Sequence, residues 1–258
     1  MNRLTKLCAA LICTGVVLKI LSCSATGAES HSWYIKRNGK EIPFFPSDAC
    51  ELDKLGCYYV DKEANRSGKK RLYLTFDAGY ENGNIEKILD TLKEENVPAA
   101  FFILKNLIYK NSDIVERMAN EGHLVCNHTA SHKNITACSK EEIEKEIYGL
   151  EQIYTKTTGK IMNKYFRFPE GRYSTQSIKI INELGYKTVF WSFAYEDWDN
   201  SEQPSEDYAI KKIMDNTHDG AVILLHPTSS TNAKILSKLI KIWREQGYEF
   251  ATLDDLTK

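Results

Sequence analysis

The stretch "RLYLTFDAGY", Arg71 to Tyr80, provides the first indication of the fold. Its first half is apolar and rich in residues that favour strands, which predicts a buried strand over Leu72 to Phe76. Asp77 follows where such a strand should emerge into solvent, and Ala78 comes next. An acid at this point is a candidate catalytic group, although a single aspartate after a strand more often forms a turn or a cap. The other strand ends of the chain decide between these interpretations.

From residue 71 onward, short β-rich runs alternate with amphipathic stretches of helical period. Strands are expected over Leu72 to Phe76, Ala99 to Leu104, His123 to Asn127, Tyr165 to Arg167, Lys187 to Ser192, Val222 to Leu225 and Glu249 to Thr252. Helices are expected between them, over Ile85 to Glu95, Asp113 to Glu121, Ser139 to Thr158, Thr175 to Leu184, Asp207 to Asn216 and Asn232 to Gln246. Ser139 with Glu142 predicts a capping box, and Gly185 and Gly247 predict helix ends. The alternation predicts an α/β fold whose parallel sheet is closed as a barrel or left open.

The length and composition fit one core. A chain of 258 residues with 42% hydrophobic content supports a single large domain, which we expect over 71–258. The less regular segment 29–70 is expected to wrap onto that domain, with "DKEANRSGKK" at 61–70 as an exposed turn. The formal net charge of -1 gives no electrostatic footprint for nucleic acid, so no nucleic-acid partner is expected. We also expect a monomer.

Residues 1–28 have the order of an export signal, with a basic start, an apolar run from Leu7 to Leu18, and small and polar residues after it. Lys19 interrupts the apolar region, which resumes in "ILSC" and approaches the length of a membrane span. We expect an extracytoplasmic protein whose signal is cleaved, in preference to retention as a membrane anchor. Membrane contact is expected through this segment alone. Cys23 is a candidate for lipidation, although an ordinary apolar cysteine is the favoured interpretation.

Four cysteines lie beyond the leader: Cys50, Cys57, Cys126 and Cys138. An even number in an exported protein permits a Cys50–Cys57 loop and a Cys126–Cys138 loop. Spacing alone establishes neither, so the disulfide state stays open.

Reactive side chains follow five of the expected strands. They are Asp77, the pair His128 and His132, Arg167, Asp197 and His226. In α/β barrels, the loops after the carboxyl ends of the strands converge on one face that holds the active site. Each residue alone has an ordinary explanation, such as a surface ion pair or a buried structural histidine. Their occurrence at successive strand ends indicates a site with an acid, an arginine, two histidines suited to a metal, and an Asp–His pair.

In this order, the segments "TFDAG", "HTASH", "RFPEG", "FWSFAYEDW" and "ILLH" resemble the five motifs of the polysaccharide deacetylase (chitooligosaccharide deacetylase-like) carbohydrate esterases, over about Leu72 to Leu256. "TFDAGYENG", Ala194 and "SWYIKRNGKEIP" are most similar to the delta-lactam-biosynthetic de-N-acetylase branch of spore-forming bacteria. The resemblance implies a distorted (β/α) barrel. It also implies hydrolysis of the N-acetyl group of N-acetylmuramic acid in peptidoglycan strands without the stem peptide, leading to muramic delta-lactam in spore cortex.

The resemblance implies a role for each residue at the strand ends. His128 and His132 would hold a divalent metal, with zinc as the expected ion, and Asp77 would be the general base. Arg167 would orient Asp77 and lower its pKa. His226 would be the general acid, aimed by Asp197.

Three further residues would contact the substrate by the same resemblance. A backbone N–H near Glu170 would help to bind the oxyanion, Trp198 would form an apolar wall beside the acetyl methyl group, and Tyr80 would line the site. Glu170 stands where close relatives often carry arginine, and Arg172 lies two residues away.

The main departure from the family pattern is Ala78, where the family places an aspartate as a third metal ligand. The delta-lactam branch also tends to lack that acid, so the identity of the metal and its third ligand stay open. Two alternatives remain. One is a deacetylase of N-acetylglucosamine in peptidoglycan or chitin-like glycans, and the other is a non-catalytic glycan-binding relative. Whether the site also closes the lactam ring is a further open question.

Overall fold

The computed structural model describes residues 29–258, so the expected export signal or anchor at 1–28, Cys23 included, lies outside the described residues. The central sheet is parallel and consists of β4 (Arg71–Ala78), β5 (Ala100–Ile103), β6 (Leu124–Asn127), β7 (Tyr165–Phe166), β9 (Lys187–Thr188), β10 (Ala221–Leu225) and β11 (Glu249–Phe250). Its order is β10-β4-β5-β6-β7-β9, with β11 beside the start of β4. Phe193 bridges Ile223 of β10 in parallel, which brings the two edges of the curled sheet together. The predicted distorted (β/α) barrel is therefore confirmed.

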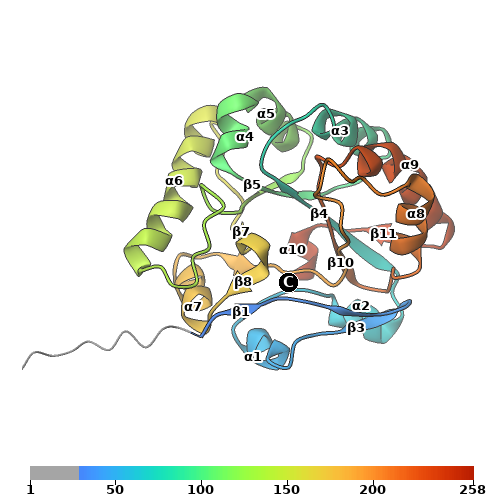
Figure 1. The fold of residues 1–258 in the computed structure, drawn as a ribbon, viewed down its shortest axis with the longest axis horizontal. Coiled ribbons are helices and arrows are strands. Elements are labelled where there is room, and N and C mark those ends of the chain that lie inside the picture. Colours follow the sequence, from blue (N-terminus) through green and yellow to red (C-terminus); the bar gives the residue numbers. More distant parts are fainter. Residues whose placement is uncertain (1–28) are drawn as a thin grey trace, which may run out of the picture.

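Helices surround the strands (Figure 1). They are α3 (Ile85–Glu94), α4 (Lys105–Lys110), α5 (Ser112–Asn120), α6 (Lys140–Thr158), α7 (Thr175–Glu183), α8 (Glu206–Met214), α9 (Ser230–Glu245) and α10 (Leu253–Leu256). The predicted capping box is present at α6, where the Ser139 hydroxyl accepts from the Glu142 N–H and the Glu142 carboxylate accepts from the Ser139 N–H. Gly185 and Gly247 follow the ends of α7 and α9 at φ 81° and 86°, as a left-handed helix stop requires.

The core of the barrel is built on β4 and β10. All five residues of β10 are buried, as expected for a parallel strand that is covered on both faces. On β4, Phe76 stacks on Phe101 of β5 at 5.0 Å between ring centres. A strand that is anchored in this way holds Asp77, its second-last residue, in a fixed position at the rim.

The N-terminal part lies along one side of the barrel (Figure 1, blue). It contains β1 (His31–Ser32), β2 (Lys36–Asn38), β3 (Glu41–Phe44), α1 (Ala49–Lys54) and α2 (Lys62–Ser67). β1 pairs with β8 (Arg172–Tyr173), which follows a single 3-10 turn at Pro169–Gly171. Further along, Tyr58 and Val60 bridge Val189 and Ala221.

Two expectations about local structure are wrong. Residues 61–70 contain the helix α2 instead of a turn, because the Asp61 side chain caps it by accepting from the Ala64 N–H at 2.8 Å and Gly68 ends it at φ 67°. The strand expected over Lys187 to Ser192 ends at Thr188. Beyond Thr188, Val189 pairs with Tyr58, and the carbonyl groups of Val189 and Phe190 accept hydrogen bonds from Arg167. The regular hydrogen-bond ladder of the sheet therefore does not continue.

Within residues 29–258, Cys50, Cys57, Cys126 and Cys138 are all free, so neither of the two permitted disulfide loops is present. In the same part of the chain, no helix combines the length and the apolar character that a bilayer crossing needs.

Candidate active site

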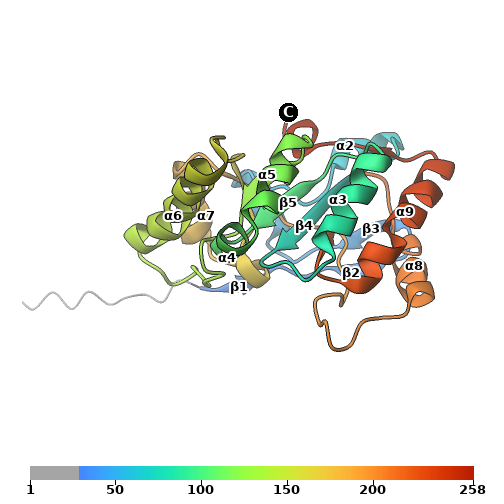
Figure 2. The same ribbon diagram turned by 90° about the horizontal axis from the view of Figure 1, so that it is seen from above.

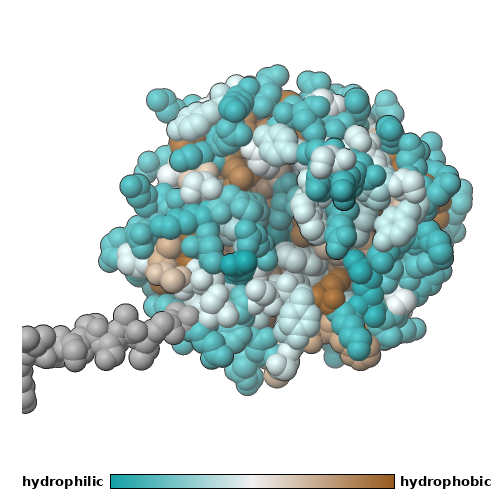
Figure 3. All heavy atoms as spheres, viewed as in Figure 1, coloured by the Kyte–Doolittle hydropathy of each residue, from teal (hydrophilic) through white to brown (hydrophobic). Residues whose placement is uncertain are grey.

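The carboxyl ends of the strands surround a cavity of about 720 Å³. The face that carries it is the one seen in Figure 3, and it is hollowed near its centre. The loop between β9 and α8 rises from this face, as the side view in Figure 2 shows. Seven of the predicted site residues line the cavity: Asp77, Tyr80, His128, His132, Glu170, Trp198 and His226. The other two, Arg167 and Asp197, lie behind it and bond to residues that line it.

Asp77 forms a buried ion pair with Arg167. The Arg167 Nη1 donates to Asp77 Oδ1 at 2.8 Å, and the Arg167 side chain is fully buried. Burial raises the pKa of Asp77, but the charge of Arg167, with smaller contributions from His128 and His226, lowers it by more, so the pKa lies below its usual value. Asp77 is therefore ionised at neutral pH, as a general base must be.

Arg167 is held by groups that the sequence did not indicate. Its Nη2 donates to the Thr75 hydroxyl at 2.9 Å, and its Nε donates to the Val189 carbonyl at 3.1 Å. Its guanidinium lies 4.1 Å from the centre of the Phe102 ring. These contacts satisfy the buried donors, so Arg167 presents one fixed N–H to Asp77.

The chemistry of His128 and His132 fits a divalent metal. The Nδ1 of His128 lies 2.8 Å from the Arg167 carbonyl oxygen, so a proton there leaves the Nε2 lone pair free. That Nε2 is 3.5 Å from Asp77 Oδ2, and the ring centres of His128 and His132 are 5.0 Å apart. Burial lowers the pKa of His128 to about 4, which keeps the ring in the neutral form that binds metals. His132 reaches this place from the loop after β6, with φ at 60°.

In the part of the chain that the structure describes, His128 and His132 belong to no larger cluster of metal-binding side chains. Within residues 29–258, no group of three His, Cys, Asp or Glu side chains is arranged to hold a metal ion. Ala78, the position at which the family resemblance would place an acid, is fully buried in the hydrophobic core. A metal bound here would depend on the two imidazoles, with water, substrate oxygens or Asp77 in the remaining positions.

His226 and Asp197 form the second pair. Asp197 Oδ1 lies 2.7 Å from His226 Nδ1, and Oδ2 accepts from the His226 backbone N–H at 2.8 Å. Burial lowers the pKa of His226, but the hydrogen bond to Asp197 and its charge raise it by more, so the pKa lies above its usual value. The imidazole ring is therefore biased toward the protonated form that a general acid needs.

Asn232 and Tyr195 support this pair, and sequence reasoning missed both. The buried Asn232 Nδ2 donates to Asp197 Oδ2 at 2.6 Å and to the His226 carbonyl at 3.1 Å. The Tyr195 hydroxyl donates to Asn232 Oδ1. An asparagine in the first turn of a helix resembles a surface residue in sequence, and it gives no signal that it reaches a site near residue 197.

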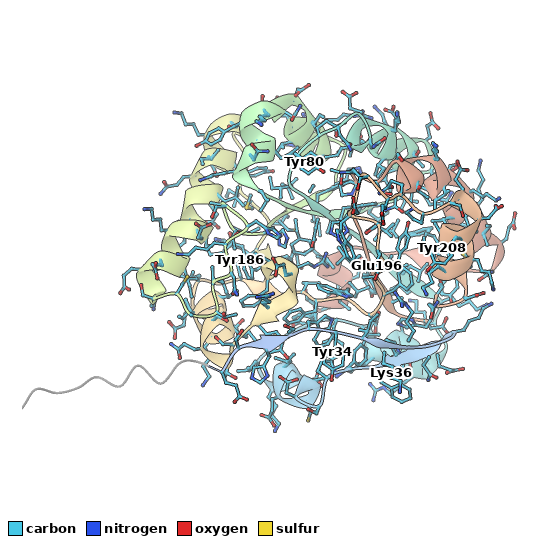
Figure 4. All side chains as sticks on the ribbon, viewed as in Figure 1. Tyr34, Lys36, Tyr80, Tyr186, Glu196 and Tyr208 are labelled. Atoms are coloured by element: carbon cyan, nitrogen blue, oxygen red, sulfur yellow. The ribbon has the colours of Figure 1, made fainter. Side chains whose placement is uncertain are left out.

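The predicted substrate contacts occupy the rim. Glu170 has a left-handed backbone (φ 55°) within the 3-10 turn, and its carboxylate pairs with Arg172 Nε at 2.9 Å. Trp198 is 56% exposed and its ring centre lies 6.0 Å from that of His226. Tyr80, labelled in Figure 4, accepts a hydrogen bond from Asn200 across the cavity mouth. The cavity thus combines an ionised carboxylate, an imidazole whose pKa is raised by Asp197, and the exposed ring of Trp198.

Comparison with known proteins gives consistent matches. A family model described as polysaccharide deacetylase matches residues 64–189. The chain is 38% identical over 241 residues to an uncharacterized 30.6 kDa protein of Geobacillus stearothermophilus, covering 91% of this chain and 89% of that protein. It is 35% identical over 249 residues to the peptidoglycan-N-acetylmuramic acid deacetylase PdaA of Bacillus subtilis, covering 96% and 93%. A peptidoglycan-N-acetylglucosamine deacetylase of Bacillus cereus is 34% identical, covering 73% and 68%.

Among solved structures, that of Bacillus subtilis PdaA, a family 4 carbohydrate esterase, superposes with a TM-score of 0.84 at 35% sequence identity. The match covers 88% of this chain and 97% of that one. The similarity therefore extends over most of the chain.

Proposed function

Because the chain belongs to the polysaccharide deacetylase family, we propose that it is a hydrolase that removes the acetyl group from N-acetylmuramic acid in peptidoglycan. We place it on the cell-wall side of the membrane, where that polymer lies. The finer proposal is that its substrate is muramic acid without the stem peptide, on the way to muramic delta-lactam in spore cortex. The resemblance of "TFDAGYENG" and Ala194 to that branch supports this choice.

The observation that carries the proposal is that two ion pairs reach the same cavity. Asp77, which is paired with Arg167, and His226, which is paired with Asp197, both line it. Amide hydrolysis needs a base for the attacking water and an acid for the departing nitrogen. In the proposed reaction, Asp77 takes a proton as water adds to the acetyl carbon. His226 gives its proton to the nitrogen as the C–N bond breaks, which leaves acetate and a free amine on the sugar.

In this proposal His128 and His132 would hold a divalent ion, with zinc as the expected metal, which would polarise the acetyl carbonyl when bound. The backbone N–H near Glu170 would donate to the carbonyl oxygen as it becomes negative. Trp198 would cover the acetyl methyl group and exclude water from that side. Tyr80 would contact the sugar at the opening.

A second candidate substrate is N-acetylglucosamine in the same polymer, which the similarity to the Bacillus cereus deacetylase favours. Both candidates use the same chemistry and differ in the sugar that enters the cavity.

Mass spectrometry of digested peptidoglycan tests the proposal. The purified protein, supplied with zinc, is incubated with peptidoglycan whose stem peptides have been removed and with intact peptidoglycan. We expect loss of one acetyl group from muramic acid in the peptide-free strands only, and a further loss of water if the same site closes the lactam. Asp77→Asn should stop acetate release, whereas Asp113→Asn on α5 should not.

Acetyl loss from glucosamine alone would assign the second candidate. If no divalent metal gives acetate release from either polymer, the chain is not a deacetylase.

A further inference from the structure

A second cavity adjoins the catalytic one. It has a volume of about 350 Å³ and shares two lining residues, Tyr195 and Trp198, with the catalytic cavity. Its other walls come from the loop between β9 and α8, from α8 itself, and from Arg37 of the N-terminal part. A polymer that has one unit in the catalytic cavity can therefore pass over Trp198 and place a neighbouring unit here.

Aromatic rings form part of the second cavity. Tyr208 on α8 is 54% exposed and Trp198 is 56% exposed, so both present ring surface to solvent. Figure 4 shows Tyr208 beside the loop that carries Glu196. Large aromatic side chains are costly to leave in water, and rings of this kind with a polar end are common in binding surfaces.

The polar groups of the cavity are available to a ligand. Within residues 29–258, the carboxylates of Glu196 and Glu202 take part in no hydrogen bond or ion pair with other protein groups, and the Lys212 ammonium lies 5.8 Å from the centre of the Tyr208 ring. Arg37 is held at the edge by a 2.7 Å hydrogen bond from its Nη2 to the Ala194 carbonyl. The cavity thus offers acceptors and donors beside aromatic rings, and no single charge sign dominates it.

We propose that this second cavity is a saccharide-binding subsite that holds a sugar of the same glycan strand, next to the sugar that loses its acetyl group. A pyranose ring has an apolar face of C–H groups, which stacks on an aromatic ring, and a rim of hydroxyls, which bond to carboxylates and to cationic donors. Tyr208 supplies the stacking surface, and Glu196 and Arg37 supply the polar contacts. The inference rests on the proposed function, because it takes a glycan strand as the substrate.

The mixed charge argues against nucleic acid as the ligand. Nucleic acid requires a predominantly basic surface, and the carboxylates of Glu196 and Glu202 oppose a polyanion. The sugar next to muramic acid in an alternating peptidoglycan strand is N-acetylglucosamine, which carries no charge, so its hydroxyls can bond to the acids and to the cations of the cavity alike.

NMR titration of the full chain tests the subsite. The Asp77→Asn protein, which stops turnover, is titrated with N-acetylmuramic acid alone and with a peptide-free strand of six alternating sugars. We expect the strand, but not the single sugar, to shift the amide signals of α8 and of residues 195–202. Adding Tyr208→Ala should weaken strand binding about tenfold, which is the size of effect that an aromatic contact in an interface typically has.

Two further variants guard against indirect effects. Tyr208→Phe keeps the ring and should keep the affinity. Tyr109→Ala removes an exposed tyrosine on α4 that lines neither cavity, and should leave the affinity unchanged.

The subsite is overturned if the α8 signals do not move with the strand, or if Tyr208→Ala binds it as well as the parent protein does. Failure of the proposed function gives a different result. A protein that binds the strand at Tyr208 but releases no acetate refutes the deacetylase and retains the subsite. A protein that releases acetate, with strand affinity independent of Tyr208, retains the deacetylase and refutes the subsite.

Discussion

At the scale of single residues, the charge on His226 depends on neighbours that need not touch the substrate. The Asp197 carboxylate forms hydrogen bonds with both the ring and the backbone N–H of His226. Asn232 donates to the same carboxylate and to the His226 carbonyl. The geometry fixes one proton of the protonated His226 ring on Nδ1, facing Asp197, and directs Nε2, which would carry the donated proton, to the other side of the ring. Asp197 is a positioning residue in this arrangement, and its removal should alter the pH at which the enzyme works.

Asp197→Asn tests this dependence. Because Asp197 raises the pKa of His226, the variant should lose the protonated acid at a lower pH than the parent does. The alkaline limb of the plot of kcat/KM against pH should move to lower pH, and the maximum should fall about 100-fold. Asp215→Asn, an exposed aspartate at the end of α8, serves as control. An unchanged alkaline limb would contradict the assignment of His226 as the acid.

Ala78 gives a prediction about metal affinity. Its side chain is fully buried, so Ala78→Asp places a carboxylate out of water and should lower the free energy of unfolding of the metal-free protein by about 3 kcal/mol. The same carboxylate should tighten zinc binding about tenfold or more, because an anionic ligand joins the two imidazoles. Calorimetric titration with zinc measures the affinity, and Ala78→Asn controls for size. Equal zinc affinities in the parent protein and in the Ala78→Asp variant would show that the position does not face the metal.

At the scale of elements, the N-terminal segment helps to build the site. The Trp33 backbone N–H donates to the Gly171 carbonyl at 2.8 Å, and the indole Nε1 donates to the Trp191 carbonyl at 2.9 Å. Gly171 has φ 65°, and a Cβ there would lie 2.8 Å from the Trp191 ring and 3.1 Å from the Trp33 Cβ. Glycine is therefore required, and the turn beside Glu170 is held in place from outside the barrel.

The Trp33→Phe variant tests whether Trp33 positions the turn beside Glu170 or only packs in the aromatic cluster. The phenyl ring keeps the stacking on Phe190, whose ring centre is 4.8 Å away, but it loses the hydrogen bond to Trp191. We expect kcat to fall about tenfold with little change in KM, and the free energy of unfolding to fall by about 1 kcal/mol. Tyr59→Phe, in the same aromatic cluster, should lower stability without lowering kcat. A loss of stability alone in Trp33→Phe would assign Trp33 a purely structural role.

At the scale of the whole molecule, the sequence predicts the barrel well because its signals are local. β10 is a continuous apolar run, β4 is apolar from Leu72 to Phe76 apart from Thr75, and α6 carries both its cap and its periodic buried face. Since parallel strands end at one rim, the reactive residues after them could be grouped without knowing a single distance. The roles of those residues stay proposals, and their positions in one cavity are what the structure adds.

The remaining features depend on contacts between distant parts of the chain. Thr75 supports Arg167 across 92 residues, and Trp33 reaches Trp191 across 158. Neither residue type signals such a role, because threonine is common in strands, as at Thr75 in β4, and Trp33, just after β1, resembles any buried aromatic residue in sequence. The short helix α2 was missed for a different reason, since its few apolar residues gave no helical period and only Asp61 and Gly68 marked its ends.

The stability of the whole molecule should depend on pH through His123, which precedes β6. Its ring is buried edge-on against Phe101, and within the described residues neither ring nitrogen has a hydrogen-bond partner. Burial lowers the pKa of His123 to about 4, against a small opposite effect of Glu121 and a small further lowering by Arg117. In the unfolded chain the ring titrates near pH 6.5.

The unfolded state therefore binds the extra proton between pH 6.5 and pH 4, and the folded state does not. The free energy of unfolding should fall as the pH drops through this window, by about 3 kcal/mol from this group. Urea unfolding at a series of pH values measures the fall. His123→Leu should match or exceed the stability of the parent at pH 7, because it removes an unpaired buried imidazole, and it should lose about 3 kcal/mol less on acidification. His31→Leu, a partly exposed histidine on β1, provides the control. Parallel stability curves for the parent and His123→Leu would mean that the buried ring accepts its proton as readily in the folded protein as in the unfolded chain.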